Sequence, residues 1–278
     1  IAAGVCANLT ANDYVLSNHR SHAHYLAKNG NLNAMIAEIY LKVTGTCQGK
    51  GGSMHLVDRS AGFLGCAPIV GSTIPIAVGA AFGSVLRQEP RVVVSFFGEA
   101  ATEEGVYHES INFAVLKKLP VVFICENNLY SVYSPLSVRQ PQARQVFEQA
   151  KTYGLESFIG DGNDVIEVYG LANMAVTKAR EGQGPVFLEF STYRWREHCG
   201  PNYDDHLGYR PEGELESWKE QDPISRLRER LINESILDER ALGVMVQQLD
   251  AEIDNAFAFA ETSSFPRAEL LSADVYAR

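Results

Sequence analysis

The fold is decided by RVVVSFFGEAATEEG (residues 91–105) and LPVVFICENNLY (residues 119–130). Each stretch starts as a short apolar run and ends in polar residues, which is typical of a strand buried on both faces. Tyr107, Ile111, Ala114, Val115 and Lys118 lie between them at helical spacing. A strand, a helix and a second strand in this order favour parallel pairing through a right-handed crossover.

A third unit extends the pattern. Asp164 is placed to cap a helix with apolar residues from Val165 to Ala179, and PVFLEF at 185–190 indicates another buried strand. The sequence therefore predicts an α/β fold: a doubly wound parallel sheet with helices on both faces.

The flanking segments are predominantly helical. Apolar spacing over 32–43 predicts a helix that ends at Gly45, and GKGGSMH (49–55) predicts a glycine-rich loop. The run IVGSTIPIAVGAAFGSVL (69–86) has the length of a membrane span, but its small and polar residues favour a tightly packed buried helix over 74–86. From 211 onward the chain is charged. One helix is predicted to start at Asp222-Pro223, and a second helix is predicted to carry an apolar line of Leu242, Met245, Leu249, Ile253 and Phe257. We expect an α/β domain at 1–210 and a C-terminal helical extension of it at 211–278.

Composition excludes two classes of partner. The 278 residues carry a net charge of -10 and have a pI of about 5.2, which argues against binding nucleic-acid phosphates or an anionic membrane. Five widely spaced cysteines indicate reduced thiols in a cytosolic or matrix compartment, and a cytoplasmic location is expected. IAAGVCANLT at the start has no basic region typical of a signal peptide.

The ends of the first two strands carry oxygen ligands. Glu99 offers a carboxylate and Asn128 an amide oxygen, and the carboxyl ends of neighbouring parallel strands lie at one edge of a sheet. Such ligands suit Mg²⁺ completed by phosphate oxygens and water. The alternative is that Glu99 starts a helix and Asn127-Asn128 forms a turn.

Basic side chains are concentrated in two other segments. SNHRSH (17–22) holds an arginine and two histidines, and TYRWREH (192–198) follows the third strand. Arginine is suited to phosphate, although a solvated polar loop is the alternative for the first segment. No dinucleotide or P-loop glycine motif follows a strand.

At these residues the chain resembles the alpha subunit of the thiamine-diphosphate first component of 2-oxo acid dehydrogenase complexes, a group that includes pyruvate, branched-chain 2-oxo acid and acetoin dehydrogenases. The similar segments occur in the family's order. They are GKGGSMH, IVGSTIP, GEAATEEG, LPVVFICENNLY, DGNDV, GPVFLEFSTYR and QDPISRLRERL. The family's cofactor signature starts Gly-Asp-Gly. Here it reads Gly98-Glu99-Ala100, which keeps the acid but adds a methyl group near the diphosphate.

The resemblance implies a set of site residues. It assigns Glu99, Asn128 and the Tyr130 carbonyl to magnesium, and His198 and His22 to catalysis. The cofactor contacts that it implies are His19, Arg20, Pro68, Val70, Glu99, Ala100, Ala101, Asn128, Tyr130 and His198.

It also implies an oxidoreductase that acts on an oxo group with a disulfide acceptor. A beta subunit would supply the catalytic glutamate, in a heterotetramer of two alpha and two beta chains. A lipoyl acyltransferase would accept the acyl group from a small 2-oxo acid. Small residues at 79–83 would fit a contact between alpha subunits, or packing within the chain. Two alternatives stay open: a pathway-specific thiamine-diphosphate lyase or transferase without lipoyl transfer, and a non-catalytic cofactor-binding subunit.

Overall fold

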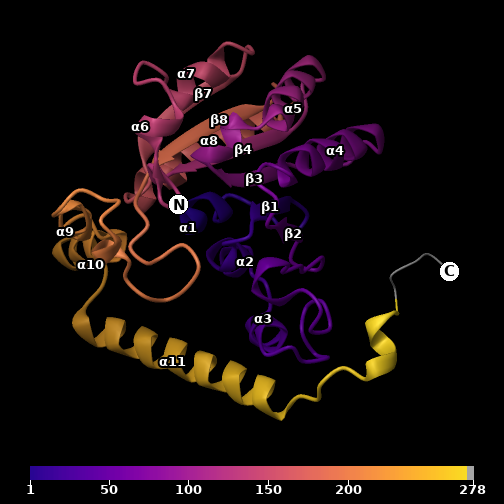
Figure 1. The fold of residues 1–278 in the computed structure, drawn as a ribbon, viewed down its shortest axis with the longest axis vertical. Coiled ribbons are helices and arrows are strands. Elements are labelled where there is room, and N and C mark those ends of the chain that lie inside the picture. Colours follow the sequence, from indigo (N-terminus) through magenta and orange to yellow (C-terminus); the bar gives the residue numbers. More distant parts are fainter. Residues whose placement is uncertain (274–278) are drawn as a thin grey trace.

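The computed structural model describes residues 1–273 (Figure 1). A six-stranded sheet has the order β2-β1-β3-β4-β8-β7, and all of its neighbouring strands are parallel. The strands are β1 (Tyr14–Asn18), β2 (Phe63–Ala67), β3 (Val93–Gly98), β4 (Val121–Asn127), β7 (Glu156–Asp161) and β8 (Val186–Ser191). A small antiparallel hairpin joins β5 (Tyr130–Ser131) to β6 (Ser134–Pro135). The predicted parallel α/β sheet is confirmed.

The side chains of the central strands alternate between two apolar cores. Along β3, Val94 and Phe96 enter one core, and Val93 and Phe97 enter the other. Because both faces are buried, β3, β4 and β8 appear in the sequence as unbroken apolar runs. Strands β1, β2 and β7 were not predicted from the sequence.

Helices cover both faces of the sheet, as predicted. One face holds α1 (Ala2–Cys6), α2 (His22–Ala27), α3 (Leu32–Ile39) and α8 (Val165–Arg180). The other holds α4 (Thr73–Leu86), α5 (Gly105–Leu116) and α7 (Val146–Lys151). The Asp164 side chain caps α8 by accepting hydrogen bonds from two backbone N–H groups.

The small-residue helix α4 is buried on one face only. Ala77 and Ala81 pack against the sheet, whereas Ile76 and Leu86 are exposed, and nothing lies within 4 Å of a Cβ built on Gly79 or Gly83. The prediction of a fully buried helix is wrong for the outer face. Within residues 1–273, no helix has the length and apolar content needed to cross a membrane.

Helix α3 ends at Ile39, earlier than the predicted stop at Gly45. Leu41 adopts a positive φ of 57°, which ends the helix. The chain then wraps around the fully buried Glu38 carboxylate, which accepts backbone hydrogen bonds from Cys47, Gly49, Gly51 and Gly52. These bonds hold the glycine-rich loop, which includes the short turn η1 (Gly52–Met54).

From 211 to 273 the chain is mainly helical, as predicted, and residues 274–278 of the predicted extension lie outside the described residues. The short turn η3 (Asp205–Leu207) precedes this region. The region itself contains α9 (Glu214–Lys219), α10 (Pro223–Asn233), α11 (Glu239–Thr262) and η4 (Ala268–Leu271). The last part of α11 packs near α3, where Phe257 meets Tyr40, but the predicted apolar face stays largely exposed at Met245 and Leu249 (Figure 1). The division of the chain at residue 210 stays a prediction.

Candidate active site

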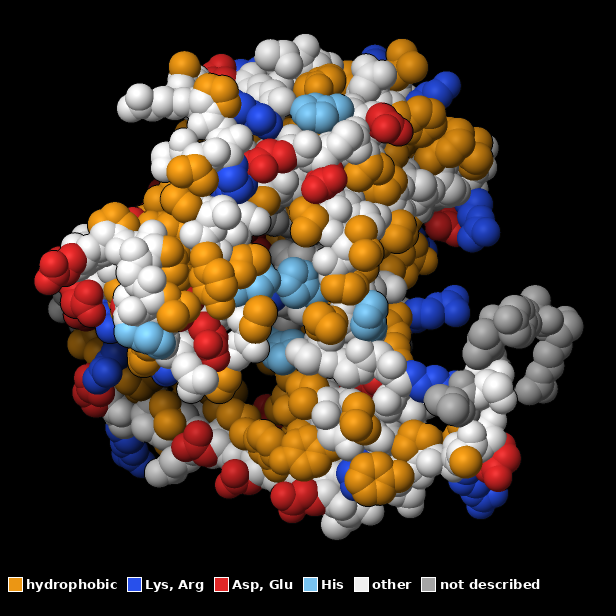
Figure 2. All heavy atoms as spheres, in the orientation of Figure 1, with side chains coloured by type: hydrophobic (Ala, Val, Ile, Leu, Met, Phe, Trp, Pro, Cys, Tyr) orange, Lys and Arg blue, Asp and Glu red, His pale blue; other side chains and the backbone are white. Residues whose placement is uncertain are grey.

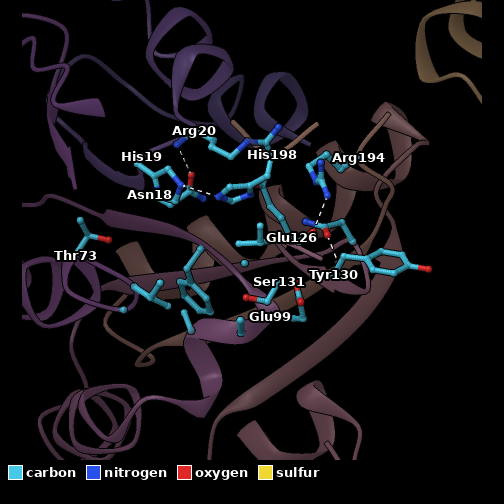
Figure 3. Close-up of a pocket in the computed structure, with 18 of the residues that line it drawn as sticks. Asn18, His19, Arg20, Thr73, Glu99, Glu126, Tyr130, Ser131, Arg194 and His198 are labelled. Carbon is cyan, nitrogen blue, oxygen red and sulfur yellow. Dashed lines mark hydrogen bonds between the residues drawn. The ribbon is translucent and has the colours of Figure 1, made fainter. Parts of the chain in front are cut away.

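An open cavity lies at the carboxyl ends of β1, β3, β4 and β8 (Figure 3). The pairing of Gly98 with Glu126 sets the ends of β3 and β4 side by side, as the sequence predicts. The lining residues are Asn18, His19, Arg20, Ala67, Ile69, Val70, Gly71, Thr73, Phe97, Gly98, Glu99, Ala100, Ala101, Glu126, Asn128, Tyr130, Ser131, Val132, Arg194 and His198.

Nine of the predicted site residues line this one cavity. They are His19, Arg20, Val70, Glu99, Ala100, Ala101, Asn128, Tyr130 and His198. Pro68 does not line it, although its neighbours Ala67 and Ile69 do. His22 is also absent from the lining: its side chain is exposed at the start of α2, with Nε2 2.7 Å from Ser53 Oγ in the glycine-rich loop.

Glu99, the first of the predicted oxygen ligands, lies on one wall of the cavity. It begins the short turn η2 (Glu99–Glu103), and only 1% of the residue is exposed. Arg139, which ends α6 (Leu136–Arg139), donates from Nη2 to Glu99 Oε1 at 2.5 Å. Burial raises the pKa of the Glu99 carboxyl, and the Arg139 charge opposes that rise.

The two adjacent asparagines at the end of β4 have different roles. Asn127 is buried and donates to Glu189 Oε1 at 2.7 Å, so it is a structural residue. Asn128 lines the cavity, and its Oδ1 accepts from the Tyr130 backbone N–H at 3.1 Å. The Tyr130 phenol points away and donates to Glu214, which leaves only the backbone of Tyr130 for the predicted metal contact (Figure 3).

The opposite wall is basic. His19 follows β1 and His198 lies in the loop after β8, with their Nε2 atoms 3.3 Å apart (Figure 3). Burial lowers the pKa of His198 to about 4, and the nearby charges of Arg20, His19 and Arg194 add to the effect. The His19 pKa is lowered by burial and by Arg20. Both imidazoles are therefore neutral near pH 7. Figure 2 shows histidines gathered near the centre of the face of the molecule that it displays.

Arg194 adds a second guanidinium to the basic wall. It is 6% exposed, and Nη2 donates to the Val132 carbonyl and to Tyr209 Oη. Its Nε is buried and has no hydrogen-bond partner in the described residues. Its Nη1 lies 3.4 Å from Asp204 Oδ2, so the guanidinium already has a carboxylate partner within the chain.

The chain matches a known family over almost its whole length. The family described as "Dehydrogenase E1 component" matches residues 1–269. The chain belongs to the dehydrogenase E1 component family. It is 37% identical to the alpha subunit of acetoin:2,6-dichlorophenolindophenol oxidoreductase from Bacillus subtilis, over 99% of this chain and 81% of that protein. It is 34% identical to the pyruvate dehydrogenase E1 alpha subunit of Porphyra purpurea, over 100% of this chain and 81% of that protein. It is also 34% identical to the chloroplastic pyruvate dehydrogenase E1 subunit alpha-3 of Arabidopsis thaliana, over 100% of this chain and 65% of that protein.

Membership of the E1 family confirms the predicted resemblance to alpha subunits and the predicted class of enzyme, an oxidoreductase. The individual site residues stay predictions, although nine of the eleven line the same cavity.

Some residues of this E1 site were missed because no local motif marks them. Glu126 lines the cavity, and its Oε1 is 3.0 Å from Nε2 of the buried His24, whose Nδ1 is 2.8 Å from Ser17 Oγ. Burial raises the Glu126 pKa, but the charge of His24 and its hydrogen bond outweigh this, and the pKa is lowered overall. His24 follows the SNHRSH segment (17–22) by two residues, yet only the fold shows that it faces a strand end 102 residues away.

The remaining edge of the cavity is apolar and exposed. Ile69 is 71% exposed and Val70 is 48% exposed, although both line the cavity. Gly71 and Thr73 follow at the N-terminal end of the 14-residue helix α4, where the helix dipole favours an anion.

Proposed function

We propose that this chain is the alpha subunit of a thiamine-diphosphate- and magnesium-dependent 2-oxo acid or acetoin dehydrogenase, and that it binds the diphosphate end of the cofactor. One observation carries the proposal. A wall of oxygen ligands faces a wall of basic side chains across a single cavity at the carboxyl edge of a parallel sheet.

The residues present fit the two groups. Glu99, Asn128 and the Tyr130 carbonyl would hold magnesium, whose usual ligands are oxygens. Arg20 and Arg194 both line the cavity and would bind phosphate oxygens, which match the geometry of a guanidinium. The neutral imidazoles of His19 and His198 would add hydrogen bonds. When bound, thiamine diphosphate supplies the carbon nucleophile and electron sink for cleaving a bond beside an oxo group.

Two observations support a divided site that needs a beta subunit. The two carboxylates that line the cavity within residues 1–273 are both bonded to basic side chains, Glu99 to Arg139 and Glu126 to His24. Neither is available to activate the cofactor's ring, so we propose that the partner supplies that glutamate. The exposed Ile69 and Val70 would then be covered by the partner, as exposed apolar patches often are.

The test is turnover of the chain with and without its beta partner. Acetoin, pyruvate and branched-chain 2-oxo acids would be assayed with magnesium, thiamine diphosphate and 2,6-dichlorophenolindophenol, the acceptor named for the 37% identical relative. We expect turnover only with the partner, and substantial turnover by the chain alone would refute the divided site.

The same preparation separates the alternatives. Acyl transfer to lipoamide supports a dehydrogenase that serves a lipoyl acyltransferase, whereas acyloin or aldehyde release alone indicates a lyase or transferase. Cofactor binding without any turnover by the complex indicates a non-catalytic subunit. The mass of the complex tests the proposed two alpha and two beta chains.

A further inference from the structure

A buried ion pair lies directly behind the predicted metal ligand. We propose that Arg139 is a positioning residue: it holds Glu99 in place and ties together the two segments that carry the magnesium ligands. The inference rests on the proposed function, because it concerns how that same site binds its metal.

Arg139 is fixed at three points. Nη2 donates to Glu99 Oε1 at 2.5 Å, Nη1 donates to Glu103 Oε1 at 2.5 Å, and Nε donates to the Ser134 carbonyl at 3.2 Å. Its side chain is 12% exposed. A side chain held in this way has lost most of its rotamer freedom, which suits a fixed structural partner better than a mobile one.

The guanidinium reaches Glu99 without entering the cavity. Glu99 lines the cavity, and Arg139 is not among the lining residues in the described part of the chain. Within residues 1–273, Arg139 is the only side chain bonded to the Glu99 carboxylate, and it uses Oε1. The second oxygen, Oε2, has no side-chain partner in the described residues, and we propose that it is the atom that binds the metal ion.

Arg139 also connects the end of β3 to the segment that follows β4. Glu99 and Glu103 are the first and last residues of the turn after β3. Arg139 lies on the stretch after β4 that begins with Asn128 and Tyr130. The Leu136 N–H donates to the Leu129 carbonyl at 2.7 Å, so α6 is anchored to the asparagine loop itself. The Arg139 ion pairs thus fix the spacing between the carboxylate ligand and the other two predicted ligands.

The charges favour this role over competition with the metal. Two carboxylates and one guanidinium leave this cluster with a net charge of -1, which still attracts a divalent cation. Without Arg139, Glu99 would be a buried carboxylate with no partner, and such a charge is costly. Partners that orient a metal ligand change metal affinity by roughly 10- to 100-fold when removed.

The experiment compares Arg139→Met with the wild-type chain, each in complex with the beta partner. Binding of Mn²⁺ is followed by electron paramagnetic resonance, and binding of thiamine diphosphate is followed by calorimetry. We expect Mn²⁺ affinity to fall roughly 10- to 100-fold, with kcat largely recovered at saturating metal. Arg139→Lys should restore part of the affinity, because one ammonium can still pair with Glu99.

Arg180→Met is the matched control. Arg180 donates to both oxygens of the buried Asp13, and neither residue lines the described cavity. It should leave Mn²⁺ affinity unchanged. An unchanged affinity in Arg139→Met would overturn the positioning role, and a tighter affinity would show that Arg139 competes with the metal.

The failure of the proposed function gives a different result. If the wild-type complex itself binds no Mn²⁺ in a Glu99-dependent way, the metal site is wrong. If the wild type binds Mn²⁺ and Arg139→Met binds equally well, only the positioning role is wrong.

Discussion

The two walls of the cavity hold their charges in opposite ways. On the oxygen wall, Glu99 is 1% exposed and already paired with Arg139. On the basic wall, Arg20 is exposed, and only its backbone N–H is hydrogen-bonded, to Asn18, among the described residues. A buried carboxylate needs a partner at all times, whereas an exposed guanidinium is solvated until an anion arrives. The comparison predicts that Glu99 is preorganised and that Arg20 becomes ordered on binding, whereas Arg194, which is 6% exposed and paired with Asp204, is already fixed.

Removing the charge from the oxygen wall should have the largest effect. Glu99→Ala leaves no charged ligand for magnesium, and the amide of Asn128 does not replace it. We expect magnesium-dependent binding of thiamine diphosphate to be lost, while weak, metal-free binding of pyrophosphate to the basic wall remains. Calorimetry with and without magnesium measures both. Thiamine diphosphate affinity equal to that of the wild type would rule out the assigned site.

Removing one charge from the basic wall should have a smaller effect that does not depend on the metal. Arg20→Met deletes a charge-assisted contact worth about 1.5–3 kcal/mol, or roughly 10- to 150-fold in affinity. Pyrophosphate binding should weaken to a similar extent with and without magnesium. Arg196→Met is the control, because Arg196 is exposed in the loop after β8 and does not line the described cavity. Equal losses in the two variants would contradict a specific role for Arg20.

The histidine on the basic wall should make stability depend on pH. The His198 pKa is about 4 in the folded chain against 6.5 for a free histidine, so the unfolded chain binds more protons between these values. Stability should therefore fall as pH drops from about 6.5 to about 4. His198→Gln should flatten this part of a plot of melting temperature against pH, and pyrophosphate should do so too by raising the His198 pKa. Identical slopes in the variant and the wild type would show that His198 does not titrate in this way.

Removing the methyl group of Ala100, which we propose lies beside the diphosphate, should have the smallest effect. Ala100 lines the cavity next to Glu99. Ala100→Gly restores the close backbone approach of the family signature, so thiamine diphosphate affinity should be equal or slightly tighter. A marked loss of affinity in the same calorimetric titration would mean that the methyl group packs favourably against the ligand.

The prediction from sequence was most accurate at the centre of the sheet. Strands β3, β4 and β8 are buried on both faces, and their sequences are continuous apolar runs. The outer strands β2 and β7 contain glycine and are buried only in part, so no such run marks them. The stop of α3 was missed because the left-handed residue that ends the helix is Leu41, with a φ of 57°, and not a glycine that would mark the stop in the sequence.

The sequence by itself determined which strand ends meet, because apolar strands and short crossovers leave few ways to build a parallel sheet. It thereby brought Glu99, Asn128 and His198 to one edge. Only the tertiary structure decided which charges pair there. Arg139 reaches Glu99 across 40 residues and His24 reaches Glu126 across 102 residues. Apolar burial leaves a periodic pattern in the sequence, whereas an ion pair depends on where two distant side chains point, and no local pattern records that direction.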